Sequence, residues 1–249
     1  MQNQDLKVWD ELAVTWATQI KPNYNFSDYL IQDGLTALLN NLTGKKVLDA
    51  GCGDGTWTNF VSNLGGDTIG IDGSENMLAM AKKNYSHIKF DQMDLLKPLA
   101  FDSNQFDVVV ASMVLFSLQE ISTFLSESAR VLKANGTMVV AVPHPCFNNA
   151  VTRLYKSLLD KLLFRKPKGL IKNYYTKTTH RHWEKGAEAK LPYYHRTLEE
   201  YSQEFKQAGF AITEMYEPHT LPKQALEKNP KIEYTTRIPR FIFFKLKLL

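Results

Sequence analysis

Between residues 45 and 143, short apolar runs alternate with segments of helical periodicity, and this alternation restricts the chain to one class of fold. Helical segments such as 75–84 and 120–133 separate the runs. The runs themselves are nearly continuous in apolar residues: 47–50, 68–71, 88–90, 106–112 and 137–142. Strands of this kind are buried on both faces, as they are when crossover helices cover a parallel sheet. The sequence therefore predicts an open α/β sheet over residues 45–143.

The segments on either side are expected to belong to the same domain, 1–249. Residues 1–44 contain two amphipathic helices, predicted at 5–20 and 28–42, which would form an N-terminal helical cap. Residues 144–196 lack strong periodic runs and are interpreted as an inserted lid.

Residues 197–249 are predicted to complete the sheet. Thr197-Leu198-Glu199-Glu200 resembles a capping box that starts a helix, and Gly209 would stop that helix. A strand at 210–217 and an apolar strand around 238–246 then return to the sheet.

Charge is distributed unevenly along the chain. The formal net charge is only +4, but residues 1–143 hold 10 basic and 16 acidic side chains, whereas residues 144–249 hold 20 and 10. The two parts are therefore expected to do different jobs. Two cysteines make no disulfide framework, and no apolar run is long enough for a membrane helix, so a cytoplasmic protein without membrane contact is expected.

The most specific motif is Val47-Leu48-Asp49-Ala50-Gly51-Cys52-Gly53-Asp54-Gly55, in which a buried strand runs straight into a glycine-rich turn. Such a turn lets backbone N–H groups approach a nucleotide closely. The dinucleotide fingerprint G-x-G-x-x-G is not met, because the third glycine comes one residue early. Asp49 and Asp54 would also repel a phosphate, which favours a cationic or neutral group in this turn.

The motif resembles the first motif of class I S-adenosylmethionine-dependent methyltransferases, and the small-molecule, type 11-like subgroup is the most similar. Further stretches match in the same order: Gly70-Ile71-Asp72-Gly73-Ser74, Asp91-Gln92-Met93-Asp94-Leu95, Phe106-Asp107-Val108-Val109-Val110 and Arg130-Val131-Leu132-Lys133. The resemblance implies a Rossmann-like sheet of seven strands with an antiparallel last strand. It also implies S-adenosylmethionine as cofactor and S-adenosylhomocysteine as product.

The resemblance assigns cofactor roles to individual residues. Asp72 closes the second strand, where a carboxylate can accept both ribose hydroxyls. Gly51 and Gly53 would pass beneath the methionine moiety, and Asp49 would help to hold the loop and the ammonium group. Asp94 is expected at the adenine amino group, next to the backbone of Leu95.

Met77 and Met113 are candidate walls for adenine and the sulfonium. Three alternatives stay open at this stage. Asp72 can instead cap the helix that starts near Ser74. Asp94 can be a capping residue, with Asp91 as its competitor. The two methionines can equally belong to the core.

Acceptor binding is assigned to the cap and the lid. Trp9, Trp16 and Tyr24 are candidates for an aromatic lid that contacts the substrate, although the two tryptophans can also be the core-facing stripe of a helix. His144 directly follows the fifth strand and is the first candidate for a general base, and His195 is the second. The alternative for His144 is a turn histidine with a structural hydrogen bond only.

The predicted function is methyl transfer to oxygen or nitrogen of a small molecule. Nine Lys and Arg residues between 161 and 190 leave methylation of tRNA or of a carrier-bound acyl group as an alternative. A noncatalytic cofactor-binding or scaffold protein is the second alternative. His180 and His182 lack the further ligands that a metal site needs, so no metal is expected.

Overall fold

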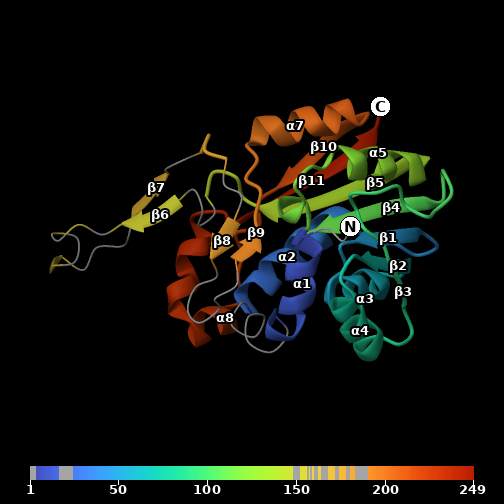
Figure 1. Cartoon of the computed structure of the whole chain (residues 1–249). Coiled ribbons are helices and arrows are strands. Elements are labelled where there is room, and N and C mark those ends of the chain that lie inside the picture. The colour runs from blue at the N-terminus through green and yellow to red at the C-terminus, as the bar shows by residue number, and fades with distance from the viewer. Residues whose placement is uncertain are drawn as a thin grey trace.

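A single seven-stranded sheet with helices on both faces forms the centre of the protein (Figure 1). The structure is a computed structural model. It describes residues 4–16, 25–147, 152–155, 157, 159, 162–163, 168–171, 174–177, 180–182 and 190–249. Tyr24 and much of the predicted lid therefore lie outside the described residues.

The five predicted strands of the first half are present and parallel. They are β1 (Lys46–Ala50), β2 (Asp67–Asp72), β3 (Lys89–Gln92), β4 (Phe106–Ser112) and β5 (Leu132–Pro143). The sheet order is β10-β11-β5-β4-β1-β2-β3, so the direction of winding reverses at β1. Ligands bind at such a switch point in open α/β sheets.

The last two strands complete the sheet as expected. β10 (Phe210–Tyr216) pairs with β11 (Phe241–Leu248), and β11 lies antiparallel between β10 and β5. The antiparallel last strand is therefore confirmed. It begins at Phe241, opposite Pro143, and not near 238.

Alternate residues of each strand face opposite layers, as the pleat of a strand requires. On one face, Leu48 and Val109 pack in a core with α5 (Ser122–Val131) and α7 (Leu198–Gln207). On the other face, Val47 and Val110 pack with α2 (Asn25–Leu39) and α3 (Thr56–Asn63). Both faces are covered, which explains why the strands have no polar alternation.

Two helices begin at the residues that the sequence indicates. α4 (Glu75–Asn84) has Ser74 as its N-cap, with the Ser74 side chain accepting from the N–H of Met77. α7 starts with the complete capping box of Thr197 and Glu200. These caps fix where the chain turns from the sheet edge into each helix.

The two helices of the N-terminal cap take different places: α1 (Gln4–Thr15) lies at the carboxyl ends of the strands, and α2 covers one face of the sheet (Figure 1). α1 packs against α4 and β9 (Lys190–Pro192), and α2 packs against β5, β10 and β11. The predicted insertion contains strands that the sequence did not indicate: β6 (Thr152–Tyr155) with β7 (Lys168–Ile171), and β8 (His180–His182) with β9.

A short helical region between β10 and β11 was also not predicted. It consists of α8 (Lys223–Lys228) and a 3-10 helix at Pro230–Thr236. Ala225 and Ile232 of this region pack in the core beside α2. In the described part of the chain, no helix has both the length and the apolar character to cross a membrane.

Candidate functional site

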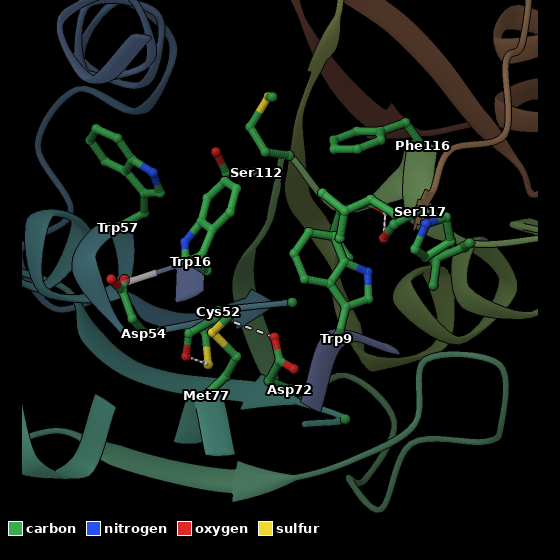
Figure 2. Close-up of a pocket in the computed structure, with 18 of the residues that line it drawn as sticks. Trp9, Trp16, Cys52, Asp54, Trp57, Asp72, Met77, Ser112, Phe116 and Ser117 are labelled. Atoms are coloured by element: carbon green, nitrogen blue, oxygen red, sulfur yellow. Dashed lines mark hydrogen bonds between the residues drawn. The ribbon is translucent and has the colours of Figure 1, made fainter. Parts of the chain in front are cut away.

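A cavity of about 240 Å³ lies at the carboxyl ends of the parallel strands, with α1 and α2 contributing to its walls (Figure 2). Its lining starts at the glycine loop after β1 and the end of β2, and continues through the loop after β4 to Phe241 at the start of β11. The cavity thus extends across both sides of the switch point in the sheet.

The glycine loop reaches the cavity in a conformation that glycine favours. Gly51 and Gly53 have φ angles of 75° and 53°. A Cβ on Gly51 would lie 2.4 Å from Cγ2 of Val114, so no side chain fits between this loop and the loop after β4. The N–H groups of Gly51 and Cys52 donate to the carbonyl of Ile71, which anchors the loop on β2.

Asp72 lines the cavity and holds the loop at the same time. Its Oδ2 accepts from the N–H of Gly53 at 2.9 Å, and its Oδ1 accepts from the N–H of Ser74 at 2.9 Å. A carboxylate can accept about four hydrogen bonds, so Asp72 keeps acceptor capacity for a ligand. Burial raises the pKa of this carboxyl. The alternative that Asp72 only caps the following helix is wrong, because the N-cap of α4 is Ser74.

Asp49 does not line the cavity, contrary to the prediction that it reaches the ammonium group. Its side chain is on the same face of β1 as Val47, beneath α3, where Oδ2 accepts from the Thr58 hydroxyl at 2.7 Å. Burial is the main cause that raises its pKa to about 7. Asp49 therefore supports the base of the loop.

The segment after β3 supplies Asp94 and Leu95 to the cavity, and α4 supplies Met77. Asp94 Oδ1 accepts from the N–H of Leu96 at 3.0 Å, and its Oδ2 lies 3.4 Å from the Lys97 ammonium. The competing carboxylate, Asp91, pairs with Lys89 and does not line the cavity. Of these two carboxylates, Asp94 is therefore the better candidate to bind the adenine amino group.

The loop after β4 has a strained backbone at the cavity. Met113, which lines the cavity, has a φ angle of 61°, a left-handed conformation that is uncommon for residues with a side chain. Ser112 precedes it, and the Ser112 hydroxyl is buried without a hydrogen-bond partner among the described residues. Because Ser112 also lines the cavity, its hydroxyl is available to a ligand there.

Trp9 and Trp16 of the cap line the cavity, and their rings meet edge to face at a centroid distance of 5.9 Å (Figure 2). The buried residues of α1 are Leu12 and Ala13, whereas Trp9 is only half-buried and Trp16 follows the last residue of the helix, so the two tryptophans are not its core stripe. Tyr24, the third predicted lid residue, is outside the described residues.

Sequence reasoning missed several aromatic residues of the lining. These are Trp57, Phe116, Tyr193 and Phe241. The position of Trp57, two residues after Gly55, was the available signal for one of them. Tyr193 and Phe241 reach the cavity only through the tertiary fold, because they come from segments far along the chain.

Neither catalytic candidate lines this cavity. His144 is buried, with its Nε2 2.7 Å from Glu217 Oε1, and its Nδ1 accepts from the N–H of Cys146. Because Nδ1 is an acceptor, the proton of the neutral ring is on Nε2 and points to Glu217. Burial lowers the pKa of the imidazole. This geometry supports a structural role for His144 rather than that of a general base.

His195 is also buried, and its Nε2 lies 2.8 Å from the carbonyl of Tyr174. It faces a second, polar hollow that Arg196 and Glu200 also line. The expected entry of His195 into the cofactor cleft is therefore wrong. Among the described residues, no three His, Cys, Asp or Glu side chains gather in a way that would hold a metal ion.

Comparison with known proteins identifies the family. A family model described as a methyltransferase domain matches residues 48–140. A demethylmenaquinone methyltransferase of Lactococcus lactis is 31% identical over 190 residues, which cover 73% of this chain and 71% of that protein. The chain belongs to the class I S-adenosylmethionine-dependent methyltransferases.

Other relatives of this methyltransferase match over a shorter length. A ubiquinone biosynthesis O-methyltransferase of Bradyrhizobium diazoefficiens is 37% identical over 105 residues, covering 41% of this chain and 42% of that protein. The chain thus spans about two fifths of the length of such relatives. A putative S-adenosylmethionine-dependent methyltransferase from Listeria monocytogenes has the same fold, with a TM-score of 0.74, 23% identity, and coverage of 90% and 99%.

The residues of the methyltransferase cavity fit the cofactor of this family. The close approach at Gly51 leaves a side-chain-free surface, and the carboxylates of Asp72 and Asp94 lie at the ends of neighbouring strands. A polar group is also available on Ser112. Two carboxylates suit hydroxyl and amino donors and a positively charged ligand.

Proposed function

We propose that the protein transfers the methyl group of S-adenosylmethionine to oxygen or nitrogen of a small molecule. The observation that carries the proposal is the division of one cavity into two chemically different ends. Carboxylates and glycines line the cavity at the ends of β1, β2 and β3, and elsewhere its lining is mainly apolar and includes the aromatic rings of Phe116, Tyr193 and Phe241.

The first end suits the cofactor. Asp72 would accept the ribose hydroxyls, and Asp94, with the backbone of Leu95, would bind adenine. Met77 would pack on the adenine ring. Gly51 and Gly53 would run beneath the methionine moiety.

The aromatic end suits the acceptor. Trp9 of α1 and Trp16, which directly follows α1, line the cavity, and Phe116 and Tyr193 form a wall in which the two ring centroids are 5.4 Å apart. Such surfaces bind planar or cationic groups through stacking and cation–π contacts. The relatives named for ubiquinone and demethylmenaquinone chemistry favour an aromatic acceptor within this class.

S-adenosylmethionine supplies an activated methyl group and its own leaving group when bound. The chain is left to orient the acceptor and to exclude water, and these effects alone give large rate accelerations. The arrangement of Trp9, Trp16 and Phe116 around the cavity provides such an enclosure. His144 and His195 are not needed for this work.

Calorimetry with S-adenosylhomocysteine tests the cofactor part. We expect binding by the wild-type protein and a loss of about tenfold or more in affinity for Asp72→Ala, because hydrogen bonds to a charged group contribute about 1.5–3 kcal/mol. Absence of binding by the wild-type protein would refute the proposal.

A second measurement tests the transfer itself. The protein is incubated with S-adenosylmethionine labelled in the methyl group and with panels of phenols, aromatic amines and aliphatic amines. We expect labelled product with at least one panel. Tight cofactor binding without any transfer, to these panels or to tRNA, would instead favour the noncatalytic alternative.

A further inference from the structure

The α1 helix is fixed on the cofactor end of the cavity by its acidic side chains and by close packing. Asp10 Oδ1 accepts from the Ser74 hydroxyl at 2.8 Å and from the N–H of Asn76 at 2.9 Å. Leu6 packs on Gly73, where a Cβ would lie only 2.3 Å from Leu6 Cδ2. Both contacts adjoin Asp72, so this side of α1 closes over the end of β2.

The start of α1 is held separately, by Tyr194. The Tyr194 hydroxyl donates to Asp5 Oδ2 at 2.7 Å. Burial is the main cause that raises the pKa of Tyr194 to about 12, and the bond to Asp5 adds to it, so the phenol keeps its proton at neutral pH. Hydrogen bonds from a neutral hydroxyl to a carboxylate are among the stronger ones in proteins.

The main chain of the same residue holds the acceptor wall. The N–H of Tyr194 donates to the carbonyl of Phe116 at 2.7 Å. Two residues later, the buried guanidinium of Arg196 donates to the carbonyls of Leu115, Leu118 and Gln119 at 2.9–3.1 Å. The loop held in this way supplies Phe116, Ser117 and Leu118 to the cavity.

We propose that Tyr194 is a positioning residue that couples the α1 cap to the acceptor wall. Its hydroxyl fixes the helix that carries Trp9, and its N–H fixes the loop that carries Phe116. The cap then closes over the cofactor at the same time as the acceptor wall takes up its arrangement. This inference rests on the proposed function, because it assumes that a cofactor binds beneath α1.

The first test measures dissociation of S-adenosylhomocysteine by stopped-flow tryptophan fluorescence. We expect Tyr194→Phe to raise the dissociation rate about tenfold, since it removes one hydrogen bond to a carboxylate. Tyr175→Phe is the matched control, because Tyr175 is 85% exposed, and it should behave as the wild type. A rate for Tyr194→Phe within twofold of the wild type would overturn the proposal.

A double-variant cycle separates the coupling from general destabilisation. If the hydroxyl acts through Asp5, the double variant Asp5→Ala with Tyr194→Phe dissociates no faster than either single variant. If the double variant instead showed the product of the two single-variant increases in dissociation rate, the proposal would be contradicted. The cycle also covers the case in which one substitution lowers stability, since thermal unfolding of each variant reports that loss separately.

Hydrogen exchange tests the link to the acceptor wall. In the wild type, S-adenosylhomocysteine should protect amides in α1 and in residues 115–119 together. In Tyr194→Phe the protection of 115–119 should fall, and equal protection in both proteins would overturn the coupling. Failure of the wild-type protein to bind S-adenosylhomocysteine is a different result, because it would refute the proposed function.

Discussion

Asp49 and Thr58 lie 2.7 Å apart across the base of the glycine loop, and the buried carboxylate accepts the threonine hydroxyl. The pair joins β1 to α3 directly beneath the turn that forms the cavity. Burial in this pair removes the carboxylate from water, and this desolvation raises the pKa of Asp49 to about 7. The loop is therefore supported by a group whose charge changes near neutral pH.

The first prediction concerns the stability of the unliganded protein against pH. The folded state holds the Asp49 proton up to about pH 7, whereas the unfolded state releases it near 3.8. Unfolding then releases a proton in this window, so the contribution of Asp49 to stability falls as pH rises through it.

Comparison with Asp49→Asn isolates this effect from other titrations. We expect the difference in unfolding free energy, wild type minus variant, to fall by about 3 kcal/mol between pH 5 and pH 8, measured by urea denaturation. A difference that is independent of pH would show that Asp49 titrates normally in the folded protein.

The second prediction concerns the close approach at the loop. Gly51→Ala places a Cβ 2.4 Å from Val114 at a φ angle of 75°, so it should cost about 2 kcal/mol or more in stability and weaken binding of S-adenosylhomocysteine. Gly44→Ala has a similar φ angle of 73° with open space around the Cβ. Gly44→Ala should lower the free energy of unfolding by about 1 kcal/mol and leave the binding of S-adenosylhomocysteine unchanged. Equal effects of both substitutions would argue against the close approach.

Much of this architecture follows from local patterns. The strands 47–50 and 106–112, the helix 75–84 and the capping box at Thr197 are determined by nearby residues, because burial on both faces and end capping leave direct sequence signals. The positions of Asp72 and Asp94 follow from strand ends in the same way.

The rest depends on tertiary contacts that no local pattern encodes. His144 was expected in the cleft because it follows β5, but Glu217, 73 residues later, draws its ring away from the cavity. Asp49 was expected to reach the ligand, but the pleat of β1 turns it beneath α3. Tyr193 enters the cavity from a segment that lacks periodicity. Side-chain direction at the sheet edge was the missing information.

The third prediction separates the structural and catalytic roles of His144. His144→Ala removes the bond to Glu217, so we expect lower thermal stability. The methylation rate of the folded variant should stay within about threefold of wild type, whereas removal of a general base typically costs 10²–10⁴-fold. The measurement is kcat with the first acceptor found. A loss of about 100-fold with normal cofactor affinity would restore His144 as the base.

The fourth prediction compares two carboxylates three residues apart after the third strand. Asp94 lines the cavity, and Asp91 pairs with Lys89 outside it. If Asp94 binds the adenine amino group, Asp94→Asn should lower the affinity for S-adenosylhomocysteine about tenfold, since the amide oxygen is a weaker acceptor than a carboxylate. Asp91→Asn should leave the affinity unchanged. An inosine-containing cofactor carries a carbonyl oxygen in place of the amino group, so it should bind Asp94→Asn at least as tightly as wild type, because the Asn amide can donate to that oxygen. A tenfold loss that persists with the inosine analogue would instead assign Asp94 to support of its own turn, through the N–H of Leu96.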